Sequence, residues 1–97
     1  MIDKASAIAL VQARIESFGP LGEGDRWEVF ADRTLERSFG WVVFYGSHLH
    51  RETGRAEYAV AGNAPFIVNR RTGEIVVLGT ARPIENYLLE YEAKTSA

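Results

Sequence analysis

The residues that could do chemistry gather in one short run, Ser47-His48-Leu49-His50. Two histidines two positions apart point the same way on a strand and could share a metal ion. A metal site needs three or four ligands, however, and the nearby candidates are only Glu52 and Glu57. We therefore interpret the segment as a solvated loop and expect no metal and no cofactor. A small metal-dependent enzyme centred on His48 and His50 remains as an alternative.

The sequence motifs of other catalytic and nucleotide-binding sites are absent. Ser47 is next to His48, but catalytic partners are defined by folded geometry, and no Gly-x-Ser-x-Gly turn surrounds this serine. The glycines at positions 19, 22 and 24 precede no P-loop lysine and form no dinucleotide-binding fingerprint. The chain has no cysteine, which excludes a thiolate nucleophile and a disulfide framework. We predict that the protein is not an enzyme.

The composition excludes several classes of partner. A chain of 97 residues with 46% hydrophobic and 25% charged residues has material for one core, so we expect a single domain over residues 1–97. The net charge of -2 argues against nucleic acid as a partner. The helical stretches carry charges that forbid a membrane span, and an acidic residue at position 3 argues against a secretory leader. We expect a cytoplasmic protein.

Two amphipathic helices are expected, one near each end of the chain. Apolar residues recur at helical spacing over residues 3–18, with Asp3 placed as the N-cap and Gly19-Pro20 as the stop. Pro83 suits the first position of the second helix, in which Ile84, Tyr87, Leu88 and Tyr91 trace one face.

Between the helices, the hydrophobic period changes to two. Strands are predicted at residues 27–31, 39–45, 57–61, 66–69 and 74–78, with a turn within 32–38 and a loop or irregular edge at 47–54. Gly62-Asn63 indicates a tight turn, and Arg70-Arg71-Thr72-Gly73 connects the last two strands as a hairpin. The predicted class is α+β: a mostly antiparallel sheet of about five strands, with both helices packed on one face.

The strand at 39–45 is apolar on both faces, because Trp41, Val43 and Tyr45 alternate with Val42 and Phe44. One face must line the core. The other is either an exposed aromatic patch of the kind that binds proteins, or it lies under the segment 47–55. An aromatic sheet face without a catalytic set indicates a binding module.

An ordered series of short motifs resembles the YrhB-like, immunity protein 35 family. The resemblance covers residues 3–92, almost the whole chain. It is carried by the runs Phe39-Gly40-Trp41-Val42-Val43-Phe44-Tyr45, Gly62-Asn63-Ala64-Pro65-Phe66-Ile67-Val68, Thr72-Gly73, Leu78-Gly79-Thr80-Ala81 and Pro83-Ile84-Glu85-Asn86-Tyr87.

This resemblance implies a small bacterial α+β protein without catalytic activity. Such a protein binds and neutralises a cognate toxin of a polymorphic toxin system, encoded next to it. The name-giving branch implies an alternative, a chaperone-like holdase that binds unfolded clients through an exposed apolar sheet face. A homodimer through an exposed sheet edge is also open.

For a toxin-binding role we expect inhibition by occlusion of the toxin's surface. Contacts are expected between the shared motifs, in residues 32–37, 47–55 and 70–71, because specificity is tuned to one partner. Arginine and aromatic side chains are common anchors. The candidate contact residues are Tyr45, His48, His50, Arg51, Arg70 and Arg71.

Overall fold

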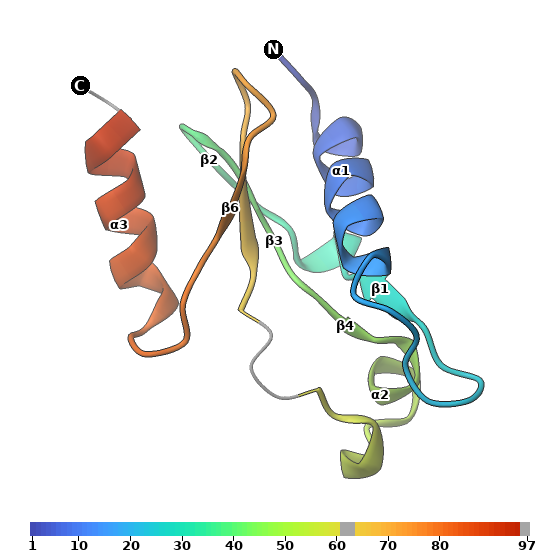
Figure 1. Cartoon of the computed structure of the whole chain (residues 1–97). Helices are drawn as coiled ribbons and strands as arrows, with labels where there is room; N and C mark the ends of the chain where they lie inside the picture. Colours follow the sequence, from blue (N-terminus) through green and yellow to red (C-terminus); the bar gives the residue numbers. More distant parts are fainter. Residues whose placement is uncertain (61–63, 96–97) are drawn as a thin grey trace.

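The structure is a computed structural model that describes residues 1–60 and 64–95 (Figure 1). Its elements in chain order are α1 (Lys4–Glu16), β1 (Trp27–Val29), the 3-10 turn η1 (Ala31–Arg33), β2 (Leu35–Arg37), β3 (Gly40–Val43), β4 (Tyr45–Ser47), α2 (His48–Thr53), the 3-10 turn η2 (Ala56–Tyr58), β5 (Phe66–Asn69), β6 (Ile75–Val77) and α3 (Ile84–Thr95). The turn expected at Gly62-Asn63 lies outside the described residues.

The strands form two antiparallel sheets. One has the order β2-β3-β5-β6, and the other pairs β1 with β4. The expected long strand at 39–45 is divided at Phe44, whose carbonyl oxygen accepts a hydrogen bond from the Phe30 amide at 2.8 Å. The chain therefore leaves the larger sheet after Val43 and pairs with β1 from Tyr45 onward. The antiparallel α+β class is confirmed, but the described residues form six strands in two sheets.

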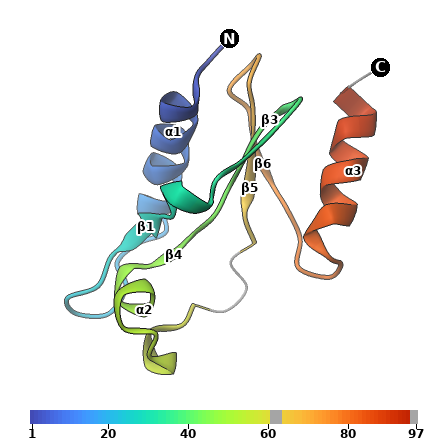
Figure 2. The ribbon, with the colours of Figure 1, turned by 180° about the vertical axis from the view of Figure 1, so that it is seen from behind.

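The terminal helices lie on opposite sides of the larger sheet, as both views show (Figures 1 and 2). Buried residues of α1, with Val11 at their centre, pack against the odd-numbered side of β3, which includes Trp41. Leu88 of α3 packs against the opposite face of the sheet, which includes Val42 of β3 and its partner Ile67 of β5. The prediction that both helices share one face is therefore wrong. A strand that is apolar on both faces needs a cover on each, and each helix supplies one.

The aromatic residues of β3 and β4 are not an exposed patch. Trp41 is 3% exposed and Tyr45 is 8% exposed, because both belong to the cluster under α1. The other face of the strand, with Val42 and Phe44, packs in a second cluster with Leu88 of α3, so neither sequence-based alternative describes it. Strand periodicity identified the two apolar faces but not the elements that bury them.

Local signals at the start of α1 and at the last hairpin are confirmed, whereas α3 begins at Ile84, one residue after the predicted first position at Pro83. The Asp3 carboxylate accepts a hydrogen bond from the Ser6 amide at 2.8 Å and caps α1. Gly73 closes the β5–β6 hairpin with a φ of 75°, in the left-handed region that favours glycine. The prediction of a strand at residues 57–61 is wrong, because residues 57 and 58 belong to the 3-10 turn η2 and residues 59 and 60 are not in a strand. Residue 61 lies outside the described residues.

Gly40 is required where β3 meets β5. Its φ is 147°, and a Cβ atom at this position would lie 2.0 Å from the Val68 carbonyl oxygen. Side chains cannot approach a backbone oxygen so closely, so glycine is needed for the β3–β5 pairing.

Candidate partner-binding surface

Segment 47–54, expected as a loop, contains the short helix α2. Ser47 is its N-cap and accepts a hydrogen bond from the His50 amide at 3.0 Å. Gly54 ends the helix with a left-handed φ of 69°. A helix of six residues is too short to show a hydrophobic period, but its two capping residues were visible signals.

Asp25 holds the start of α2 from the loop before β1. Its carboxylate accepts hydrogen bonds from the Ser47 hydroxyl at 2.5 Å, the Leu49 amide at 2.9 Å and the Arg26 amide at 2.8 Å. Burial raises the pKa of Asp25, but these hydrogen bonds outweigh it, so the pKa lies below its usual value and the group stays ionised. Ser47 is 2% exposed and its hydroxyl is committed to Asp25, which argues against a nucleophilic role.

A charged network joins α2 to β1. Glu28 Oε1 lies 3.0 Å from His48 Nδ1, and Glu28 Oε2 lies 3.8 Å from Arg51 Nη1. The Arg51 guanidinium also pairs with Asp32 and lies 4.8 Å from the centre of the Phe30 ring. These contacts fix two of the predicted contact residues, His48 and Arg51, on one partly exposed surface.

The two histidines lie on a helix rather than on a strand. Positions two apart on a helix do not share a face, so the expectation that His48 and His50 point the same way does not apply. Within residues 1–60 and 64–95, no three side chains of the histidine or carboxylate type are grouped to hold a metal ion.

The six predicted contact residues are not brought together. His48, His50 and Arg51 are on α2, whereas Arg70 and Arg71 are at the β5–β6 hairpin, at the opposite end of the molecule (Figures 1 and 2). Tyr45 is a core residue whose ring stacks on Phe66 at 5.1 Å, so we leave it out of the surface.

Arg70 and Arg71 have different environments. The Arg70 guanidinium donates to Glu36 at 2.9 Å and to the Arg37 carbonyl at 2.8 Å, and lies 4.9 Å from the centre of the Trp41 ring. Its side chain is 25% exposed. Arg71 is exposed. Arg70 therefore braces the sheet, and Arg71 is the residue of this pair that is open to a partner.

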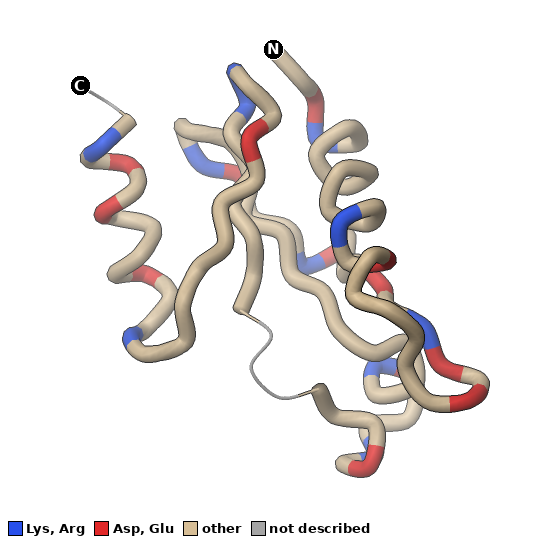
Figure 3. Tube along the Cα trace, in the orientation of Figure 1, with Lys and Arg blue, Asp and Glu red and all other residues tan. Residues whose placement is uncertain are grey.

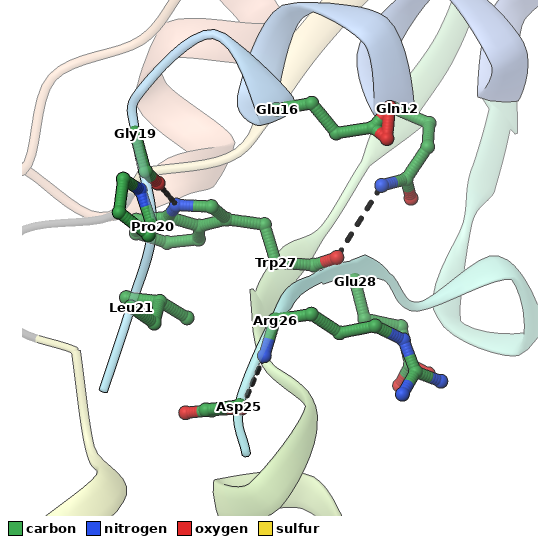
Figure 4. A pocket seen from close by; sticks show the side chains of 9 residues that line it. All are labelled: Gln12, Glu16, Gly19, Pro20, Leu21, Asp25, Arg26, Trp27 and Glu28. Atoms are coloured by element: carbon green, nitrogen blue, oxygen red, sulfur yellow. Dashed lines mark hydrogen bonds and ion pairs between the residues drawn. The ribbon is translucent and has the colours of Figure 1, made fainter. Parts of the chain in front are cut away.

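Sequence reasoning missed a surface pocket of about 610 Å³ between the end of α1, the following loop and β1 (Figure 4). Gln12 and Glu16 line it from α1, and Asp25, Arg26 and Glu28 line it from the other side. Trp27, Pro20 and Leu21 supply apolar surface. The cluster of acidic residues around a tryptophan at 23–28 was the available signal.

The Trp27 side chain is fixed in this pocket. Its Nε1–H donates to the Gly19 carbonyl at 2.8 Å, and its ring meets Phe18 edge-on at 5.5 Å. The Gln12 side chain forms two hydrogen bonds with β1. Its Nε2 donates to the Trp27 carbonyl at 3.3 Å, and its Oε1 accepts from the Val29 amide at 3.1 Å. The pocket is thus preformed by contacts between α1 and β1.

The described residues form a small α+β protein with two antiparallel sheets and a helix near each end of the chain. At one end of the molecule, hydrogen bonds and ion pairs hold α2 against β1 and the loop before it. The chain belongs to the Immunity protein 35 family, whose model matches residues 5–93. It is 47% identical over 57 residues to the "Uncharacterized protein YrhB" of Escherichia coli (strain K12). That match covers 59% of this chain and 61% of the relative.

No solved structure matches the chain significantly. In the part of the chain described, none of the helices combines the length and apolar character needed to cross a bilayer.

Proposed function

We propose that this protein binds a cognate bacterial protein toxin and neutralises it by covering the surface through which the toxin acts. The observation that carries this proposal is membership of the Immunity protein 35 family over residues 5–93. In this role the protein acts by binding and does not itself catalyse a reaction.

The end of the molecule around α2 and β1 is the best candidate for the contact surface. Arg51 is held over Phe30 and between carboxylates of Glu28 and Asp32, so little side-chain freedom remains to be lost on binding. Arginine and histidine on a fixed helix can donate hydrogen bonds to a partner's carboxylates or carbonyls. We keep Arg71, at the other end of the molecule, as a second candidate contact.

Occlusion is feasible for a chain of this size. A standard interface takes about 800 Å² from each partner. The accessible surface of the protein is 5950 Å², so such an interface would occupy roughly one seventh of it. An area of that size exceeds α2 alone and would include its neighbours on β1 and the loop before it.

The aromatic strand does not provide the exposed face that the holdase alternative requires. That alternative required an exposed apolar sheet face, but the aromatic strand is buried under α1 on one side and packs with α3 on the other. We therefore do not propose it as a function.

The experiment that tests the proposal is a tagged pull-down from the bacterium that encodes the chain, with bound proteins quantified by mass spectrometry. We expect one partner at a fixed stoichiometric ratio, whose expression without this protein stops bacterial growth. A broad set of substoichiometric unfolded proteins, or a stoichiometric partner that is harmless when expressed alone, would overturn the proposal.

A further inference from the structure

We propose that the pocket between α1 and β1 receives a basic side chain, an arginine or a lysine, from the toxin. This inference rests on the proposed function for the identity of the partner. Its geometry and charge are properties of the pocket itself and can be tested without the toxin.

The shape of the pocket suits a long side chain with an apolar stem and a charged head. Its volume of about 610 Å³ falls within the usual range for binding cavities. Trp27, Pro20 and Leu21 provide apolar surface for the methylene groups. Because Trp27 is held by Gly19 and Phe18, the wall does not have to form on binding.

The charge of the pocket favours a cation. Three carboxylates, of Glu16, Asp25 and Glu28, line it with a single cation, Arg26. Figure 3 shows acidic positions along the loop that joins α1 to β1. By its place in the sequence, Glu23 belongs to this loop.

The three carboxylates differ in the number of ion pairs and hydrogen bonds that they already form. Glu28 has His48, Arg51 and Arg26 as partners. Asp25 accepts its hydrogen bonds from a hydroxyl and two backbone amides, which leave its negative charge in place. Within residues 1–60 and 64–95, the exposed Glu16 carboxylate forms no hydrogen bond or ion pair. Glu16 is thus the carboxylate most available to an incoming cation.

The pocket is continuous with the proposed contact surface. Glu28 lines the pocket and also binds His48 and Arg51 of the charged network. Asp25 lines the pocket and holds the start of α2. A partner seated on α2 therefore lies next to an acidic cavity, into which a basic residue of that partner can reach as an anchor.

A titration of the labelled protein with a short peptide tests the pocket. The probe is the tripeptide alanine-arginine-alanine with blocked ends, and the control peptide carries citrulline, which is uncharged and nearly the same shape. The readout is the set of amide and indole N–H signals in a two-dimensional NMR spectrum. Trp27 Nε1–H reports on the pocket, and the buried Trp41 provides an internal reference.

The arginine peptide is expected to shift the signals of Trp27, Leu21 and Glu16, and to leave the Trp41 indole unchanged. The citrulline peptide is expected to cause much smaller shifts. Equal shifts with both peptides, shifts centred elsewhere, or no shifts would each overturn the proposal.

Variants that change the charge of the pocket test whether its carboxylates bind the peptide. Glu16→Lys is expected to weaken peptide binding by about tenfold, because it places a like charge in the cavity. A cation near the end of α1 suits the helix dipole, so folding should be preserved. The matched control, Glu92→Lys, changes an exposed carboxylate near the end of α3 and should bind normally. Arg26→Gln removes the pocket's own cation and should strengthen binding.

The same variants separate this proposal from the proposed function. If wild-type protein neutralises a toxin and Glu16→Lys does so equally well, the pocket is not the anchor site and the immunity function stands. If the arginine peptide binds in the pocket but no toxic partner is found, the cation site stands and the immunity function is wrong.

Discussion

Glu28 and His48, 20 residues apart in sequence, are joined by a 3.0 Å contact between Oε1 and Nδ1. The contact ties the first turn of α2 to strand β1 and makes one surface from two segments that sequence reasoning treated separately. Because Glu28 also lines the acidic pocket, the α2 surface and the pocket share a wall. A partner that binds one is therefore positioned to contact the other.

The fixing of α2 by Asp25 has a consequence for pH dependence. The pKa of Asp25 is lowered in the folded state, because its hydrogen bonds outweigh the effect of burial. Its contribution to stability is therefore full above the unfolded value near 3.8 and is lost as the pH falls toward the lower folded value. Asp25→Asn should lower the free energy of unfolding by about 1 kcal/mol at neutral pH.

The dependence of the free energy of unfolding on pH, measured below neutral pH, tests this prediction. Urea denaturation from neutral pH down to about pH 2 should show a smaller loss of stability on acidification for Asp25→Asn than for wild type. Glu23→Gln, an exposed neighbour on the same loop, is the matched control and should behave as wild type. An identical pH dependence for Asp25→Asn and wild type would contradict the assignment.

Gly40 is expected to be intolerant of any side chain. Gly40→Ala places a Cβ atom 2.0 Å from the Val68 carbonyl oxygen in a backbone conformation with φ of 147°. We predict a loss of about 3 kcal/mol or more, or the loss of cooperative folding. At Gly22 an added Cβ atom would have no atom beyond its chain neighbours within 4 Å, so the free energy of unfolding of Gly22→Ala should lie within about 0.5 kcal/mol of the wild-type value. Thermal unfolding followed by circular dichroism compares the two, and similar midpoints would argue against the β3–β5 pairing.

The placement of α3 on its own face of the sheet can be tested with two adjacent leucines. Leu88 is 2% exposed and belongs to the cluster with Val42 and Ile67, whereas Leu89 is 61% exposed. Leu88→Ala should cost about 2–5 kcal/mol, and Leu89→Ala about 0.5 kcal/mol or less. If the two variants had equal denaturant midpoints, α3 would not be packed as described.

Arg70 and Arg71 should differ in how much they contribute to the free energy of unfolding. Arg70→Ala removes two hydrogen bonds and the contact with the Trp41 ring, so a loss of about 1–2 kcal/mol is expected. Arg71→Ala removes an exposed side chain and should leave the free energy of unfolding unchanged within about 0.5 kcal/mol. Chemical denaturation distinguishes them, and the reverse order would show that the bracing role belongs to Arg71.

Local signals in the sequence predicted local structure well. Asp3 and Gly73 marked a helix start and a hairpin turn because capping and left-handed glycine depend on near neighbours only. The exchange of the chain between sheets at Phe44 depends on its contact with Phe30, 14 residues away, which no local pattern reveals. The same holds for the opposite faces covered by α1 and α3.

The candidate site was predicted in part. His48, His50 and Arg51 do lie on one short helix beside β1, although that segment was expected as a loop. Tyr45 was chosen as an aromatic anchor, but the alternation that marked it as apolar was also the sign that it belongs to the core. The acidic pocket around Trp27 requires the end of α1 to pack beside β1, which is a tertiary contact.

The measurement that tests the central claim most directly is growth rescue. The stoichiometric partner is expressed in bacteria alone, with wild-type protein, and with the His48→Ala/His50→Ala/Arg51→Ala variant after its folding has been verified. We predict that wild-type protein restores growth and that the triple variant rescues at least about tenfold less well. A partner whose toxicity is unaffected by wild-type protein would contradict the immunity function. Full rescue by the triple variant would remove α2 from the contact surface.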